Sequence, residues 1–419
     1  MSEARGRAVA AQPGSRHNVR VVVAGAGVFG RNHLRVLREL EIAGLGATLV
    51  AAIEPDPKRA AETAAQYAIP VFASAEELLA STRKDSGLKV DAACVAVPTI
   101  RHHAVASTLL DASLDLLVEK PLAANLEEAD SLIRKAEEKS RILQPGHLER
   151  FNPAVLAVEP RLTRPMFFEA HRLSIFTPRS LDVDVVLDLM IHDLDIVLAF
   201  THSPVREVRA VGLPILSPKV DIANVRVEFE SGCVANFTAS RVSSERVRKL
   251  RFFEPRQYVS IDYARRDVLV IRIDDAPAAA PDPLAALPPQ IRAAIPAHIA
   301  AAIASGTLDL TKIDPALISS FAAAAGIDPA VIAQLTAQLI AKRSASAGPA
   351  PGLSFLKPEV APAEPLRLEI LSFLDSVRTR RPPQVTAQQG RAALALALEI
   401  QSVMAAHAQR AGLGDFFKS

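Results

Sequence analysis

The segment from Val19 to His33 constrains this chain more than any other, because it reads VRVVVAGAGVFGRNH. An apolar run typical of a buried parallel strand meets three glycines spaced GxGxxG, at Gly25, Gly27 and Gly30, and a helical pattern follows at once. The first glycine permits a tight turn, the second lets a phosphate approach the backbone, and the third lets helix and strand pack closely. Because the N-terminus of a helix favours anions, the segment predicts a dinucleotide-binding site.

A carboxylate follows the next predicted strand, ATLVAAIEP, at Glu54. It lies somewhat further along than the roughly 20 residues usual for the acidic group that binds the adenosine ribose, and a longer first helix absorbs the difference. The same carboxylate would repel a 2′-phosphate, so we expect NAD to be preferred to NADP. Neighbouring Lys58 and Arg59 keep that preference moderate.

Composition excludes several classes of protein. The 419 residues carry a formal net charge of only +2, which gives no reason to expect nucleic acid or an anionic membrane as a partner. Apolar stretches stay short of the roughly 20 residues of a spanning helix, and the opening residues lack the apolar core of a signal peptide. Cys94 and Cys233 each fall inside a predicted strand, so we expect buried, reduced thiols and a cytoplasmic protein.

The hydrophobic pattern divides the chain into five parts. After a polar tail at 1–18, strands and helices alternate through 19–150, which predicts a Rossmann domain with a parallel sheet. Long alternating runs in 151–273 predict an α+β domain with an open, mostly antiparallel sheet and helices on one face. An alanine- and proline-rich insertion at 274–363 follows, and 364–419 completes the second domain with helices. The fold class is therefore α/β.

The insertion contains a short internal repeat, KIDPALISSF and GIDPAVIAQL. Asp314 and Asp328 suit helix N-caps, with Pro315 and Pro329 at the first helical positions. We expect two or three short helices in an otherwise mobile surface insertion. A contact with a partner or a second copy is the alternative.

Lys120 is the first candidate catalytic residue. It stands at the carboxyl end of a predicted buried strand, in Glu119-Lys120-Pro121, at the edge of a parallel sheet where ligands bind. Burial and the positive ring of a bound nicotinamide would lower the pKa of this lysine and make it usable in proton transfer. A strand-end lysine of this kind is otherwise a surface charge.

The segment VVLDLMIHDLDIVLAF, predicted as one apolar helix from about 185 to 199, carries the second candidate site. Asp188, His192 and Asp195 stand at i, i+4 and i+7, hence on one face that must meet a polar cleft or a polar network. His192 suits general acid–base work, and Asp188 can orient it or bind substrate hydroxyls. A structural histidine network is the alternative, and no metal site is expected.

Arginines follow the first domain in GHLERFNP (Arg150) and HRLSIFTPR (Arg172 and Arg179). Because arginine binds phosphates bidentately, these residues suit a charged substrate such as a nucleotide sugar. Solvated charges at the rim are the alternative for each.

Taken together, GAGVFG, PTIRH at 98–102, EKP at 119–121 and DLMIHDLD at 188–195 resemble the Gfo/Idh/MocA oxidoreductases, NAD(P)-dependent enzymes of sugars and inositols. The usual helix motif of that family is DxGxHxxD, and Met190 replaces its glycine here. The resemblance implies catalytic roles for Lys120, Asp188 and His192. It implies that the cofactor is lined by Gly25, Gly27, Val28, Phe29, Gly30, Glu54, Pro98, His102 and Glu119. The expected substrate-binding residues are Arg150, Arg172, Arg179 and Asp195, and the arginines fit this resemblance.

Longer stretches, among them GHLERFNPAV and DIANVRVEFESGCVANFTASRVS, resemble the bacterial UDP-N-acetylglucosamine 3-dehydrogenases. That resemblance implies oxidation at carbon 3 of the sugar, ahead of an aminotransferase, for a diamino sugar of lipid A. The alternatives are a dehydrogenase or reductase of another sugar or an inositol, and a cofactor-sensing regulator without turnover. The open sheet face makes a homo-oligomer the expectation.

Overall fold

The computed structural model describes residues 18–83, 87–177, 183–273, 297, 301 and 353–413. Their contacts form two compact units. One comprises Met1–Phe252, Ile261–Val268 and Glu359–Ser419, and the other comprises Phe253–Ser260 and Leu269–Pro358, in each case for the described residues. The helices expected to begin at Asp314 and Asp328 lie outside the described residues.

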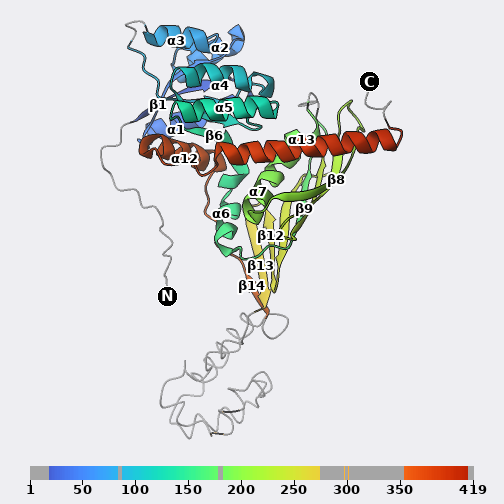
Figure 1. Cartoon of the computed structure of the whole chain (residues 1–419). Coiled ribbons are helices and arrows are strands. Elements are labelled where there is room, and N and C mark those ends of the chain that lie inside the picture. The colour runs from blue at the N-terminus through green and yellow to red at the C-terminus, as the bar shows by residue number, and fades with distance from the viewer. Residues whose placement is uncertain are drawn as a thin grey trace. The chain divides into compact units, whose positions relative to one another are not determined.

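The first unit contains a parallel Rossmann sheet, as the sequence predicts (Figure 1). Its strands are β1 (Val19–Ala24), β2 (Ala47–Ile53), β3 (Val71–Phe72), β4 (Ala92–Val95), β5 (Asp115–Glu119) and β6 (Leu143–Gly146). The strand order β3-β2-β1-β4-β5-β6 reverses between β1 and β4, and in such sheets ligands bind outside the carboxyl ends of the strands at that reversal.

Both faces of this sheet are covered by helices. The evidence is that alternate residues of its strands belong to two different hydrophobic clusters. In β1, Val22 packs with α3, α4 and α5, whereas Val21 and Val23 pack with α1 and α12. This double burial explains why the strands read as continuous apolar runs. The helices are α1 (Val28–Ile42), α2 (Pro57–Tyr67), α3 (Ala75–Arg83), η1 (Thr99–Arg101), α4 (His102–Asp111), α5 (Leu126–Glu138) and α12 (Pro365–Thr379).

Two reciprocal hydrogen bonds cap the start of α5. The Asn125 side chain accepts a hydrogen bond from the N–H of Glu128 at 2.9 Å. The Glu128 carboxylate in turn accepts from the N–H of Ala124 at 3.2 Å, so two backbone donors at the helix end are satisfied.

The second sheet is mostly antiparallel, as predicted, with the strand order β14-β13-β12-β11-β7-β10-β9-β8. Alternate residues of β7, β9 and β10 are buried, which is the pattern of a sheet covered on one face. Figure 1 shows α7 and the long helix α13 along this sheet, and contacts join α13 to both α7 and β8. Its strands are β7 (Phe167–Leu173), β8 (Val205–Leu213), β9 (Ile222–Phe229), β10 (Val234–Ser240), β11 (Val247–Glu254), β12 (Gln257–Asp262), β13 (Asp267–Ile273) and β14 (Leu353–Leu356).

The helical elements associated with this part of the chain include one irregular turn, η4, which is π-helical. They are η2 (Leu148–Phe151), α6 (Pro153–Val158), η3 (Glu159–Arg161), η4 (Val186–Met190), α7 (Ile191–Thr201) and α13 (Ala387–Arg410). In the described ranges, no helix combines the length and hydropathy needed to cross a bilayer.

In the second unit, β14 pairs antiparallel with β13, with Ile271 opposite Phe355 and Ile273 opposite Leu353. These β14 residues fall within 274–363, the range expected for the insertion. The short LSFL run forms a strand because it completes a ladder with β13, which is distant in the sequence.

Candidate active site

The glycine loop joins β1 to α1, and two of its glycines are required by packing. Gly25 has φ +95°, and a Cβ there would lie 2.6 Å from the carbonyl oxygen of Ala96. A Cβ on Gly30 would lie 1.8 Å from the carbonyl oxygen of Gly25. A Cβ on Gly27 meets no described atom within 4 Å. The middle glycine therefore borders open space at the N-terminus of α1, which is what the approach of a phosphate requires.

Glu54, which directly follows β2, anchors the glycine loop through hydrogen bonds. Its buried carboxylate accepts hydrogen bonds from the N–H groups of Ala26 and Asp56, both at 2.9 Å, and from the Arg59 guanidinium at 2.8 Å. Burial raises the pKa of Glu54, but these donors outweigh it, so the pKa is lowered overall. Three of its roughly four acceptor positions are used, which leaves capacity for a ribose hydroxyl.

A cavity of about 330 Å³ opens next to the loop. We call it the Lys120 cavity. It brings together residues that the sequence analysis singled out in separate segments: Phe29, Pro98, His102, Glu119, Lys120 and Asp188. Its remaining lining comes from Ala96, Val97, Thr99, Pro121, Val183 and Leu187. The cavity therefore lies at the carboxyl ends of β4 and β5, where a parallel sheet binds ligands.

Lys120 is largely buried and is held by backbone oxygens of η4. Its Nζ donates to the carbonyl oxygen of Asp188 at 2.7 Å and approaches that of Leu187 at 3.5 Å, while the Asp188 carboxylate lies 4.0 Å away. Burial lowers the pKa of Lys120, and the negative charges of Asp188 and Glu119 only partly offset it. The peptide bond between Lys120 and Pro121 is cis.

The sequence analysis missed His33, which holds Glu119 in place. His33 lies on the buried face of α1, and its Nε2 is 2.8 Å from the Glu119 carboxylate. The indication was present, because His33 shares the apolar helical face with Leu34 and Leu37. A buried imidazole on such a face needs a polar partner, and Glu119 is that partner.

His102 faces two carbonyl oxygens. Its Nδ1 is 2.8 Å from that of Pro121 and its Nε2 is 2.9 Å from that of Val97. Burial lowers the pKa of His102, so the ring is neutral and donates to one of them. His102 thus ties η1 and α4 to the turn that carries Lys120.

The predicted helix at 185–199 is interrupted by η4, and this changes which residues share a site. Asp188 lines the Lys120 cavity, but Asp195 does not. A π-helical turn contains more residues than an α-helical one, so it rotates the residues before it relative to those after it. The expectation that Asp188, His192 and Asp195 stand along one face assumed an unbroken α-helix.

His192 follows η4 and lies within electrostatic range of Lys120. Burial holds the pKa of His192 well below its ordinary value of 6.5, and the positive charges of Lys120 and Arg172 lower it further. Its Nδ1 hydrogen-bonds to no residue that the structure describes. His192 is therefore a neutral imidazole beside a buried ammonium group.

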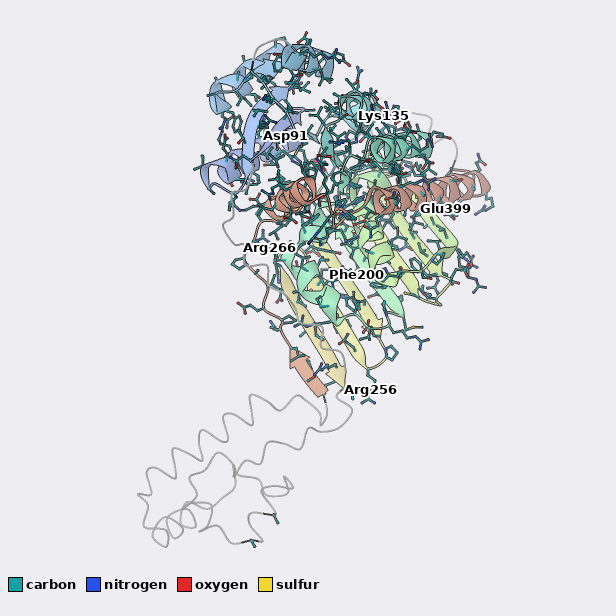
Figure 2. All side chains as sticks on the ribbon, turned by 60° about the vertical axis from the view of Figure 1, so that its left-hand side comes forward. Asp91, Lys135, Phe200, Arg256, Arg266 and Glu399 are labelled. Carbon is teal, nitrogen blue, oxygen red and sulfur yellow. The ribbon has the colours of Figure 1, made fainter. Side chains whose placement is uncertain are left out.

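Asp195 belongs to a second cavity, of about 480 Å³, which we call the α7–α13 cavity. Its carboxylate lies 3.8 Å from His147 Nδ1 and 3.7 Å from Arg150 Nη1. Arg150 lines the same cavity, so neither Arg150 nor Asp195 lies in the lining of the Lys120 cavity, where the sequence analysis expects them to face substrate. Figure 2 labels Glu399, which reaches this cavity from α13.

Arg172 is engaged within the protein. Its guanidinium binds the Asp193 carboxylate through two hydrogen bonds, at 2.8 and 2.9 Å, and the Glu149 carboxylate at 3.0 Å. These buried pairings take up the donors expected from the sequence to bind substrate, because the sequence alone does not reveal that Asp193 is their partner. Arg179 lies outside the described residues.

Residues 19–147 match the model of an oxidoreductase family with an NAD-binding Rossmann fold, and residues 155–255 match the GFO/IDH/MocA C-terminal domain. Together the two matches span more than half of the chain. This chain belongs to the Gfo/Idh/MocA oxidoreductase family.

Individual members of the Gfo/Idh/MocA family are similar to it over much of their length. UDP-N-acetylglucosamine 3-dehydrogenase of Acidithiobacillus ferrooxidans is 39% identical over 57% of this chain and 73% of its own length. The scyllo-inositol 2-dehydrogenase (NAD(+)) of Bacillus subtilis is 28% identical over 54% and 68%, respectively. The solved structure of the Acidithiobacillus ferrooxidans enzyme, GnnA, superposes with a TM-score of 0.70 and 28% identity, covering 93% of this chain and 98% of that one.

Gly27→Ala should weaken NAD binding about tenfold or more, about 1.4 kcal/mol, without lowering the thermal unfolding midpoint. The added methyl group would occupy the open space at the start of α1. The matched variant Gly30→Ala should lower both the affinity for NAD and the thermal unfolding midpoint, because its methyl group meets the Gly25 carbonyl oxygen. Calorimetric titration with NAD and thermal unfolding measure the two effects. An unchanged NAD affinity in Gly27→Ala would show that the phosphates bind elsewhere.

Proposed function

We propose that this NAD-dependent dehydrogenase oxidises the carbon-3 hydroxyl of UDP-N-acetylglucosamine to a ketone. One observation carries the chemistry: Lys120, from the end of β5, and Asp188, from η4, line the same cavity beside the glycine loop. The 39% identity to an enzyme of that name, over 73% of its length, supports the substrate.

The residues present fit NAD. The open side of Gly27 suits the pyrophosphate, Glu54 retains an acceptor for the adenosine ribose, and the Lys120 cavity suits the nicotinamide. In this proposal Val28, Phe29, Pro98, His102 and Glu119 complete the cofactor site. When bound, NAD supplies the acceptor for the hydride that leaves carbon 3.

Side chains of the protein then accept the proton of the substrate hydroxyl. His192 is neutral, so its imidazole can accept the proton of the substrate hydroxyl. The Lys120 ammonium donates a hydrogen bond to the same oxygen and favours its loss of a proton, and the Asp188 carboxylate orients the lysine from 4.0 Å. Such positioned proton transfer contributes about 10²–10⁴-fold. A regulator without turnover has no need for this pair of groups.

A different arginine suits the diphosphate of the substrate. Arg248, on β11, is reached by solvent but is partly desolvated by its neighbours, and it interacts electrostatically with both His192 and Arg172. Burial and the charge of Arg172 lower the pKa of Arg248, and an added anion would relieve that repulsion. We therefore assign phosphate binding to Arg248 in place of Arg172, which Asp193 and Glu149 already occupy.

The resemblance to UDP-N-acetylglucosamine 3-dehydrogenases also supports a biosynthetic role for the reaction. The 3-keto sugar is the form that an aminotransferase converts to an amine, so we place the reaction on the route to a diamino sugar of lipid A. We further propose a cytoplasmic homo-oligomer that associates through the open face of its second sheet.

The substrate is tested by incubating the purified protein with NAD and following the absorbance of reduced cofactor. UDP-N-acetylglucosamine should be turned over, and free inositols and hexoses should react far more slowly. Arg248→Ala should raise KM for the nucleotide sugar about tenfold or more and change the reaction of an uncharged sugar little. Turnover of inositols without turnover of the nucleotide sugar would overturn the substrate and favour an inositol 2-dehydrogenase, the activity named for several relatives.

Lys120→Ala and His192→Ala should each lower kcat at least about tenfold, and up to the 10²–10⁴-fold typical of lost proton transfer, while NAD still binds. Steady-state rates and calorimetric NAD titration measure the two properties separately. Lys135→Ala, on the exposed side of α5, is the matched control for loss of a lysine and should keep the parent rate. Parent turnover in both site variants would contradict their roles.

The pH profile follows from the neutral state of His192. A base accepts a proton only in its neutral form, and the pKa of His192 is held well below 6.5. The value of kcat/KM should therefore stay level down to pH 6.5 and fall only below it. Lys120→Met removes one charge that lowers the pKa of His192, so the fall should move to higher pH. A parent profile that falls at or above pH 6.5 would contradict the assignment of His192 as the base.

A further inference from the structure

Four buried polar side chains carry atoms that bond to no residue in the described part of the chain. Gln144 and Glu369 are 0% exposed, His147 is 1% exposed and Asp195 is 2% exposed. Both amide atoms of Gln144, both carboxylate oxygens of Glu369, both ring nitrogens of His147 and Oδ2 of Asp195 make no hydrogen bond within the described part of the chain. We call this group the polar chamber. Buried polar atoms in folded proteins are almost always paired with protein or water.

Three elements, and the turn that follows one of them, supply these residues. Gln144 comes from β6 and His147 follows that strand, Asp195 comes from α7, and Glu369 comes from α12. His147 Nδ1 and Asp195 Oδ2 are 3.8 Å apart, too long for a direct hydrogen bond and short enough for one water to bridge neighbouring groups. Burial and the nearby Glu119 and Asp195 carboxylates raise the pKa of Glu369 well above its ordinary value.

The polar chamber has two ends. At one end, His147 interacts electrostatically with Lys120 and Glu119, and His192 interacts with His147. At the other end, Asp195 and Arg150 line the α7–α13 cavity, which α13 borders through Gln389, Arg391 and Glu399. His147 thus stands between the Lys120 cavity and a second opening.

We propose that the polar chamber holds ordered water and, with His147 as its relay residue, carries the substrate's proton from His192 to the α7–α13 cavity. The inference rests on the proposed function, because the proton to be moved is the one released by alcohol oxidation. In each turnover the alcohol and NAD⁺ become ketone, NADH and one proton. The hydroxyl proton passes to His192, then through water to His147, and leaves through water beside Asp195.

The distribution of charge favours this direction. A protonated His192 would face the cations Lys120, Arg172 and Arg248, which repel it. His147 faces Lys120 and Arg150 as cations, and also the carboxylates of Asp195 and Glu119. A proton that moves from His192 to His147 therefore leaves a set of positive charges and approaches two negative ones.

Burial also brings the pKa values of His147, the proton donor, and Asp195, the acceptor, closer together. It lowers the pKa of His147, with the charges of Lys120 and Arg150 adding to the effect. It raises the pKa of Asp195, although His147 and Arg150 partly oppose this. Because the two shifts bring the pKa values towards each other, a proton passes between these groups at a lower cost in free energy than between the same groups in water.

Crystallography tests the chamber without any substrate. A structure of the full-length protein at high resolution should show ordered water bonded to His147 and Asp195 and to the Gln144 amide. Each such water needs two to four polar partners, which the chamber supplies. A chamber filled by side chains alone would overturn the proposal.

Kinetics tests the relay. His147→Ala should lower kcat by about 10- to 100-fold and change KM for NAD and sugar by less than about threefold. The solvent deuterium isotope effect on kcat should grow, because proton departure becomes rate-limiting, and the effect of deuterium at the oxidised carbon should shrink. Added imidazole should restore part of the rate.

Two further variants control for the loss of an imidazole and for misfolding. His103→Ala removes an imidazole of α4 that lies 3.2 Å from the Ser131 hydroxyl, and it should show neither the loss nor the rescue. If His147→Ala fails to fold, His147→Gln fills the space without a titrating ring and should give the same isotope effects. A folded His147 variant with the parent rate, or a loss with unchanged isotope effects and no rescue, would overturn the relay. Failure of UDP-N-acetylglucosamine as a substrate refutes only the proposed substrate, since the relay is tested with whichever alcohol reduces NAD.

Discussion

The hydrogen bond from Lys120 Nζ to the carbonyl oxygen of Asp188, at 2.7 Å, is the contact on which the site depends. A buried ammonium group needs protein oxygens in place of water, and η4 supplies them. The contact fixes the end of β5 against the start of α7, and it brings the Asp188 carboxylate to 4.0 Å from the same nitrogen. The lysine and the turn thus position each other in the lining of the Lys120 cavity.

Much of the fold follows from local patterns in the sequence. The continuous apolar strands predict the parallel sheet because burial on both faces leaves no room for polar residues. Asn125 three residues before Glu128 is a pattern typical of a helix start, and it caps α5; Glu230-Ser231-Gly232 is typical of a hairpin turn, and it joins β9 to β10, where Gly232 has φ +82°. Local patterns also predict part of the lining of the Lys120 cavity, because Pro98, Glu119 and Lys120 lie in short motifs at the ends of strands.

The rest of the site depends on contacts between distant residues. No local pattern distinguishes η4 from an α-helical turn, so the sequence does not reveal that Asp188 lines the Lys120 cavity while Asp195 lines the α7–α13 cavity. Arg172 is satisfied by Asp193 from a different element, and a free guanidinium and a paired one look the same in sequence. His33 and Glu369 each sit on an otherwise apolar helical face: His33 bonds to Glu119 of β5, whereas the Glu369 carboxylate bonds to no residue that the structure describes.

Glu54 has a consequence for any attempt to redesign the cofactor preference. The residue that would discriminate against a 2′-phosphate also tethers the glycine loop through the N–H of Ala26, and Arg59 already neutralises part of its charge. Exchanging this carboxylate for a smaller or basic side chain would remove the tether together with the repulsion. A successful conversion to NADP would therefore have to rebuild the anchoring of the loop as well as the pocket for the extra phosphate.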